Sequence, residues 1–212
     1  TWLVGAEQAL TAEPIDPMKP ETGPAAIMGA SPPDEAELLR RIAIRDRSAF
    51  DVLYRAYFYR LSRFLEQITH RPYLNEEIIN DTMVVVWRKA HTFNGTSRVS
   101  TWIFAIAWRT ALKALTRLGA ATEITEDETP ASAVDEPENA FVRREWRERI
   151  ARALATLSAE HRAVVELTYY HGCAYREIAQ IVGCPVDTVK TRMFHARRKL
   201  KELLGGEAED TR

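Results

Sequence analysis

The stretch Tyr175–Leu204 constrains the fold most, because its small and apolar residues have the spacing of a helix-turn-helix. Such a motif needs a small residue where two helices cross, a glycine in the turn, and an apolar residue anchoring the second helix. Ala179, Gly183 and Val189 occupy these places, at offsets of four and six residues. Glycine suits the turn because it has no Cβ to oppose a positive φ. The spacing therefore predicts two short helices joined at a sharp angle.

The second of these helices divides into two faces. One is expected to pack inward and holds Val189, Met193, Ala196, Leu200 and Leu203. On or beside the opposite face lie Lys190, Thr191, Phe194, His195, Arg197, Arg198 and Lys201. A basic face of this kind can enter a DNA major groove, with some side chains at base edges and others on phosphates. The alternative is a plain amphipathic helix in a bundle; the basic face together with the turn spacing favours DNA recognition.

Charge is distributed in blocks, which the net charge of −1 conceals. Residues 38–117 hold 14 Lys and Arg against 6 Asp and Glu, and residues 143–204 hold 13 against 7. Residues 1–37 hold one base against seven acids, and residues 118–142 hold seven acids and no base. Two basic blocks indicate a polyanionic partner, although Arg-rich solvated helix faces would give the same count.

Helical periodicity divides the chain into an all-α fold of two small domains. Six of the ten prolines fall in residues 1–33, which predicts a disordered N-terminal tail. The first helical domain is expected at 34–118, with Ser48 as a helix cap and a loop over 93–97. A flexible acidic linker is predicted at 119–138, a second helical domain at 139–204, and a polar tail at 205–212.

Several residues carry groups that could bind a metal or take part in catalysis. His171, Cys173, Cys184 and His195 lack the spacing of a metal site, so buried thiols are favoured over ligands. Carboxylates such as Glu166 and Glu177 are expected on helix surfaces. No phosphate-binding glycine loop or nucleophile arrangement occurs, so neither an enzyme nor a cofactor is expected. No apolar run is long enough to span a bilayer, and two cysteines suit a reducing, cytoplasmic compartment.

Residues Leu157–Leu204 resemble region four of the extracytoplasmic-function sigma factors of bacterial RNA polymerase. The shared features are the run Tyr-x-Glu-Ile-Ala before the turn glycine, then Thr-Val-Lys-Thr-Arg and Ala-Arg-x-x-Leu after it. The resemblance implies that the second helix reads the −35 promoter element. The matching positions are Lys190, Thr191, Arg192, Phe194, His195, Arg197 and Arg198.

Residues Asn75–Ala90 resemble region two of the same family. Asp81 and Trp87 match its pattern, while Asn80 stands where glutamine is usual and Met83 where phenylalanine is usual. The resemblance implies that this helix grips the coiled coil of the largest polymerase subunits. An anion such as Asp81 and an anchor such as Trp87 suit that role.

Residues Ser100–Leu115 resemble the segment that recognises and melts the −10 element, matching at Thr101, Trp102, Ile106 and Ala107. Arg109 stands where the family has asparagine, which leaves the −10 preference open. Trp102 is expected mainly in the core, since it is in phase with the apolar face. The residues expected at the −10 element are Phe93, Asn94, Arg98, Trp108 and Arg109, the first three from the preceding loop.

Together these resemblances imply a sigma factor that brings the RNA polymerase core to promoter DNA, is stress-responsive, and is held by an anti-sigma factor. The main alternative is a DNA-binding response regulator or activator whose N-terminal helical domain senses a ligand or partner. The sequence shows no acidic phospho-acceptor pocket on an α/β receiver, which argues against it. An adaptor that binds no DNA would leave the basic face of the last helix unexplained.

Overall fold

The computed structural model describes residues 34–119 and 139–205. The tails expected at 1–33 and 205–212 and the linker expected at 119–138 lie outside these residues, except that Gly119 and Gly205 end helices. The elements in chain order are α2 (Glu35–Ala43), α3 (Arg47–Thr69), α4 (Pro72–Lys89), the 3-10 turn η1 (Ala90–Thr92), α5 (Val99–Gly119), α6 (Asn139–Ala155), α7 (Ala159–Tyr169), α8 (Tyr175–Val182) and α9 (Val186–Gly205). The described residues contain no strand, and the predicted all-α class is confirmed. No helix within them has the length and apolar character needed to cross a bilayer.

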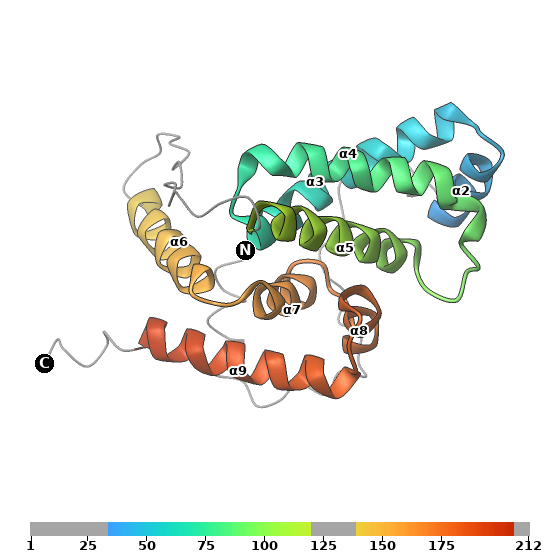
Figure 1. Cartoon of the computed structure of the whole chain (residues 1–212). Helices are drawn as coiled ribbons and strands as arrows, with labels where there is room; N and C mark the ends of the chain where they lie inside the picture. The colour runs from blue at the N-terminus through green and yellow to red at the C-terminus, as the bar shows by residue number, and fades with distance from the viewer. Residues whose placement is uncertain (1–33, 120–138, 206–212) are drawn as a thin grey trace, which may run out of the picture.

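Helices α2 to α5 form the first block, whose core lies between α3, α4 and α5 (Figure 1). The start of α3 is fixed by Asp46, whose Oδ1 accepts from the backbone N–H of Ser48 at 2.8 Å and of Ala49 at 3.2 Å. The Ser48 hydroxyl and the Arg41 guanidinium also donate to this carboxylate, and these bonds hold its pKa well below its usual range. The expectation that Ser48 itself caps α3 is wrong, because the aspartate two residues earlier accepts the free N–H groups.

The predicted helix-turn-helix is formed by α8 and α9. Gly183 has a φ of 72° and donates its N–H to the carbonyl of Ala179 at 2.9 Å, which ends α8. Val189 is fully buried, and Ala179 is 9% exposed. A Cβ built at Gly183 would meet no atom within 4 Å, so the turn needs glycine for its backbone conformation and not for space.

The residue at the N-cap of helix α8 is Ala174, which has no side-chain oxygen to accept a hydrogen bond. Only half of a capping box is present, since the Glu177 carboxylate accepts from the Ala174 N–H at 2.9 Å. Ala174→Ser should supply the missing half and stabilise the chain by about 0.5–2 kcal/mol, seen as a higher Tm in thermal unfolding. Ala151→Ser, at an exposed position inside α6, is the matched control and should lower stability slightly. An equal change in both variants would contradict this account of the α8 start.

Helices α6 to α9 form a second block that lies directly against the first (Figure 1). Helix α7 packs against α3, and α8 packs against α5. Buried residues of both blocks belong to one continuous apolar cluster. The sequence predicts a flexible linker between the two domains. Its composition gives no indication that the domains pack against each other.

Candidate nucleic-acid interface

The outer face of α9 presents a row of exposed polar, aromatic and basic side chains at helical spacing: Lys190, Thr191, Phe194 and Arg198. Phe194 is 63% exposed, which is unusual for a phenylalanine without a partner. Lys190 pairs with Asp187 at 3.0 Å and Arg198 with Glu202 at 3.7 Å, both in solvent. Exposed pairs of this kind are weak, so the two cations can exchange their carboxylates for DNA phosphates.

Two residues expected on this face are turned toward their own block. The Arg192 guanidinium lies 3.8 Å from the Cys184 sulfur, and Arg197 donates from Nε to the Tyr169 hydroxyl at 2.8 Å. Both arginines are half-buried, so the structure supports a positioning role for them. Leu203 was expected inward and is 45% exposed, because α9 runs beyond the helices that cover its middle.

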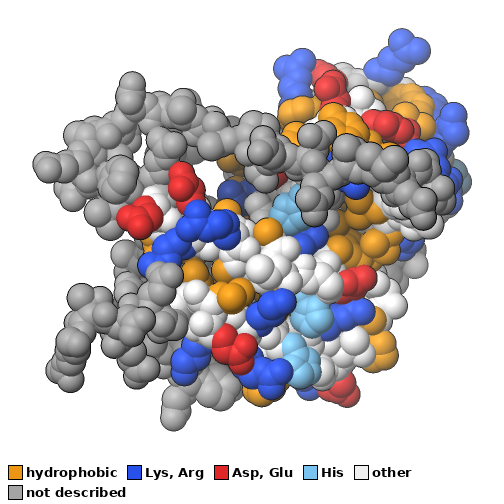
Figure 2. All heavy atoms as spheres, turned by 60° about the vertical axis from the view of Figure 1, so that its left-hand side comes forward, with side chains coloured by type: hydrophobic (Ala, Val, Ile, Leu, Met, Phe, Trp, Pro, Cys, Tyr) orange, Lys and Arg blue, Asp and Glu red, His pale blue; other side chains and the backbone are white. Residues whose placement is uncertain are grey.

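Two polar residues at the start of α7, which the sequence pattern did not predict as part of the site, lie beside α9. The Ser158 hydroxyl and His161 Nδ1 are 2.8 Å apart. Burial lowers the pKa of His161, and the nearby charges of Arg192, His195 and Lys199 lower it further. The lower part of Figure 2, at the level of α9 in Figure 1, shows Lys, Arg and His side chains side by side. Because its pKa is lowered, the His161 imidazole is neutral at pH 7, so it adds a hydrogen-bonding group beside α9 and not a charge.

The loop before α5 holds three of the residues expected at the −10 element. The Phe93 ring lies 5.6 Å from the Trp102 ring, between their centroids. Asn94 Oδ1 accepts from both the N–H and the hydroxyl of Thr96, at 3.1 and 2.7 Å, which shapes the loop. Arg98 is exposed and lies 3.3 Å from Glu177 of α8. The loop is thus a small, well-formed platform with an aromatic pair at its base.

Within α5 the structure separates the two remaining −10 candidates. Arg109 is exposed, but eleven residues of helix place it about 16 Å along the axis from Arg98. Trp108 is 3% exposed and belongs to the apolar core. The expectation that Trp108 contacts DNA is therefore not supported, because its neighbour Arg109 takes the outward position on the helix. Trp102 is half-buried, in keeping with a mainly structural place.

The three residues expected to bind polymerase lie on α4 beside aromatic residues of α3. Asn80 accepts from the Tyr54 hydroxyl at 3.0 Å, Asp81 is exposed, and the half-buried Trp87 packs edge-on against Phe50 at 5.2 Å. Exposed apolar side chains surround them, with Phe58 at 41% and Val84 at 45%. We call the following set the α3–α4 patch: Tyr54, Phe58, Asn80, Asp81, Val84 and Trp87.

The sequence pattern predicted Asn80, Asp81 and Trp87 on this surface, but not Tyr54 and Phe58 of α3. Arg45 also supports the patch, with its guanidinium 5.5 Å from the Trp87 ring and Nη1 donating to the Trp87 carbonyl at 3.1 Å. A positive φ of 70° at Arg45 turns the chain so that this side chain can reach back to α4. An apolar patch with a carboxylate at its edge is typical of a protein-binding surface.

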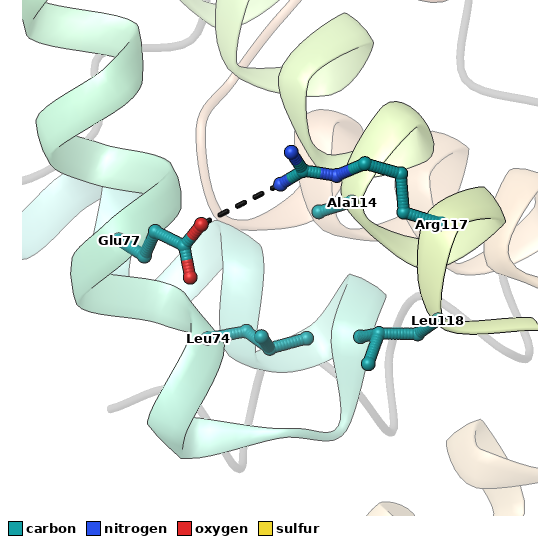
Figure 3. A pocket seen from close by; sticks show the side chains of 5 residues that line it. All are labelled: Leu74, Glu77, Ala114, Arg117 and Leu118. Atoms are coloured by element: carbon teal, nitrogen blue, oxygen red, sulfur yellow. Dashed lines mark hydrogen bonds and ion pairs between the residues drawn. The ribbon is translucent and has the colours of Figure 1, made fainter. Parts of the chain in front are cut away.

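A small hollow lies between the start of α4 and the end of α5 (Figure 3). Its volume is about 160 Å³, and Glu77 and Arg117 face each other across it at 3.5 Å. The remaining lining is apolar, from Leu74, Ala114 and Leu118. Ligand pockets usually reach about 300–1,000 Å³, so this hollow is too small and shallow for a nucleotide. Elsewhere among residues 34–119 and 139–205 no cluster of three potential metal ligands occurs.

Two family models match the chain, each over one of the two blocks. Residues 53–120 match "Sigma-70 region 2", and residues 147–200 match "Sigma-70, region 4". The first range contains the α3–α4 patch and the −10 candidates, and the second contains the helix-turn-helix. The order of the two models along the chain is the order in which the sequence resemblances occur.

Curated relatives and solved structures agree with the models. The chain is 25% identical to the RNA polymerase sigma-H factor of Pseudomonas aeruginosa, over 80% of this chain and 93% of the relative. It is 28% identical to the sigma factor YlaC of Bacillus subtilis, over 80% and 99%. The structure of CnrH in complex with the cytosolic domain of CnrY is similar in fold, with a TM-score of 0.61, 22% identity, and coverage of 82% and 99%. The sigma factor RpoE of Bartonella quintana, solved with the anti-sigma factor NepR, has a TM-score of 0.60, 22% identity, and coverage of 74% and 98%.

Proposed function

This chain belongs to the sigma-70 family as a sigma factor of the extracytoplasmic-function type, and from that membership we propose how its surfaces divide the work of initiation. A sigma factor is an initiation factor and not an enzyme; the polymerase carries out the chemistry. We assign one domain to each block, at residues 34–118 and 139–204. The acidic segment 119–138 is the linker between them. The chain acts in the bacterial cytoplasm, where RNA polymerase is found.

The outer row of α9 is the −35 reader in this proposal. The observation that carries it is the exposure of Lys190, Thr191, Phe194 and Arg198 on one face of the second helix of a helix-turn-helix. Such a helix is the element that enters the major groove. His195 lies beside the flanking phosphates, while Arg192 and Arg197 orient the helix.

The loop before α5 reads the −10 element, with Phe93 and Asn94 forming the surface for an unstacked base. Arg98 and Arg109 hold the backbone on either side of it. The α3–α4 patch binds the polymerase core through Asn80, Asp81 and Trp87. We expect an anti-sigma factor to regulate the chain under stress; the similar Bartonella quintana protein was solved in complex with an anti-sigma factor.

The experiment that tests this assignment is reconstitution of transcription. The purified chain and core polymerase are incubated with fragmented genomic DNA of the source bacterium, and the 5′ ends of the transcripts are mapped. We expect starts at discrete sites that share two upstream elements, and none with core polymerase alone. A chain that does not bind the core polymerase would refute the proposal.

Lys190→Ala should weaken promoter binding by about 1–3 kcal/mol, because the lysine points from the outer face of α9 toward the groove. Binding is measured by footprinting the holoenzyme on a mapped promoter at several salt concentrations. Lys113→Ala removes the same charge from an exposed site on α5 and is the control. A protected −35 region that is unchanged in Lys190→Ala would favour the alternative of a protein-binding adaptor.

A further inference from the structure

Helix α2 ends in a Schellman motif whose left-handed position is occupied by Arg45. The Arg45 N–H donates to the Ile42 carbonyl at 2.9 Å, which is the first of the two bonds of the motif. The second bond runs from the Asp46 N–H to the Arg41 carbonyl, at 3.0 Å. This geometry requires a positive φ, and Arg45 has a φ of 70°. Glycine is the usual residue here, because a Cβ strains the backbone in this region, and such strain is concentrated at functional sites.

The hydrogen bonds of Asp46 fix the turn around Arg45. The Asp46 Oδ2 accepts from the Arg41 guanidinium, from Nε at 2.8 Å and from Nη2 at 2.6 Å. Its Oδ1 accepts from the N–H groups that begin α3, as described above. One carboxylate therefore joins the end of α2 to the start of α3. Because these bonds are made by its neighbours, the conformation of Arg45 is imposed on it, which is how a strained residue is kept in place.

The Arg45 side chain lies against the last turn of α4 and contacts Trp87. Its Nη1 donates to the Trp87 carbonyl at 3.1 Å. Carbonyl groups in the last turn of a helix have no partner within that helix, and a cation is favoured near them. The Arg45 guanidinium also lies 5.5 Å from the centroid of the Trp87 ring, within the range of a cation–π contact. The guanidinium thus contacts both the backbone and the side chain of Trp87.

The Trp87 indole is held by contacts from two different elements. Phe50 of α3 meets the ring edge-on, with 5.2 Å between centroids and 70° between planes. Arg45, from the turn between α2 and α3, supplies the second contact. The ring is half-buried, so part of it faces solvent within the α3–α4 patch. Two contacts restrict the rotamer of an aromatic anchor more than one contact does, and they keep it in one orientation before any partner binds.

No carboxylate accounts for an arginine at this position. Arg45 is exposed and forms no ion pair with any carboxylate within residues 34–119 and 139–205. The neighbouring Arg41, by contrast, pairs with Asp46 at 2.6 Å. A turn that needed only the positive φ would be served better by glycine. The contact with Trp87 is therefore the gain that offsets the strain at Arg45.

We propose that Arg45 is a positioning residue for polymerase binding, which holds the Trp87 indole in the orientation in which the α3–α4 patch binds the polymerase core. This role deepens the function proposed above and rests on it, because the polymerase is the partner of the patch. An anchor that is ordered before binding loses less conformational entropy on binding. Removing the Arg45 side chain should weaken core binding about 2- to 12-fold, which is the cost of ordering one large side chain.

Arg45→Gly separates this role from the needs of the turn. Glycine adopts a φ of 70° without strain, so the turn is kept while the guanidinium is lost. His70→Gly is the matched control, because His70 also has a positive φ, of 50°, at the end of α3, about 18 Å along the helix from Phe58 of the patch. Circular dichroism should show the helix content of the parent in both variants. Arg45→Lys is the conservative variant, which keeps the cation but not the planar fork.

The order of Trp87 in the free chain is the first readout. In a chain with isotopically labelled tryptophan, the Trp87 indole N–H signal is assigned by its loss in Trp87→Phe, and its heteronuclear NOE is measured. The NOE should fall in Arg45→Gly, take an intermediate value in Arg45→Lys, and stay unchanged in His70→Gly. The Trp102 indole, which packs on Phe93, is the internal reference. An unchanged Trp87 NOE in Arg45→Gly would overturn the positioning role.

Affinity for the core polymerase, measured by titration, is the second readout. It should fall about 2- to 12-fold in Arg45→Gly, less in Arg45→Lys, and remain that of the parent in His70→Gly. In a Trp87→Leu background, Arg45→Gly should cause no further loss, because a positioning residue acts only through the side chain that it holds. The same loss in both backgrounds would mean that Arg45 contacts the polymerase directly and does not act by positioning. A parent chain that does not bind the core refutes the proposed function, whereas a less ordered Trp87 with unchanged core binding refutes only the role of Arg45.

Discussion

Replacing Phe104 by alanine should destabilise the chain by about 3–5 kcal/mol, close to the whole stability of many domains. Phe104 is fully buried and packs edge-on against Phe64 with 5.2 Å between centroids. Its ring also lies 5.6 Å from the Arg60 guanidinium and 4.5 Å from the His171 ring. Alanine would leave a cavity where the cores of the two blocks meet, and neither block could fill it alone.

Guanidinium unfolding followed by circular dichroism measures this loss. Tyr73→Ala is the control: it removes an aromatic ring from α4, but the ring is 67% exposed and its loss should change stability by about 0.5 kcal/mol or less. A loss below about 1 kcal/mol for Phe104→Ala would show that the blocks do not share this core in solution. Phe104→Leu should recover much of the loss, since it restores most of the apolar volume.

The helices and the helix-turn-helix were predictable because their signals are local. A period of 3.6 residues, a turn glycine and an apolar anchor act within a few residues, so Ala179, Gly183 and Val189 could be placed correctly. Even so, the N-cap of α3 is Asp46 and not Ser48. Both residue types are good N-caps, and only the path of the backbone decides between them.

The contact between the blocks could not be predicted, because its residues are distant in sequence and of types that usually face solvent. Glu166 was expected on a helix surface and is buried against Arg63, which precedes it by 103 residues. His171 does not have the spacing of a metal ligand, and no local sequence pattern predicts its packing against Phe104. Because charged residues are rarely buried, the general rule predicts a surface position for Glu166, and that prediction is wrong.

The candidate sites were predicted in part, for a similar reason. Matching positions to a family pattern gives residue identities, but helix phase decides which side chains reach the surface. Lys190 and Arg198 point outward on α9, while Arg197 bonds to Tyr169. Trp108 precedes an exposed arginine by one residue and is therefore turned about 100° away from it, into the core.

Asp81→Arg should abolish association with the core polymerase, if the α3–α4 patch is the binding surface. Asp81 is exposed and makes no ion pair within residues 34–119 and 139–205, so its charge is available to a basic partner. It lies one residue from Asn80 and two turns of α4 before the Arg88 and Lys89 cations. Reversing a charge that pairs across an interface costs about 2–5 kcal/mol, which weakens binding by about 30-fold to 5,000-fold.

Glu76→Arg is the matched control, because it makes the same charge change on α4 but about 140° around the helix from Asp81. Binding to core polymerase is measured by titration of a fluorescently labelled chain, and circular dichroism confirms that both variants are folded. Loss of core binding in Asp81→Arg alone assigns polymerase binding to this face of α4. Equal losses in Asp81→Arg and Glu76→Arg would instead mean that net charge steers the encounter, and that the patch is not its anchor.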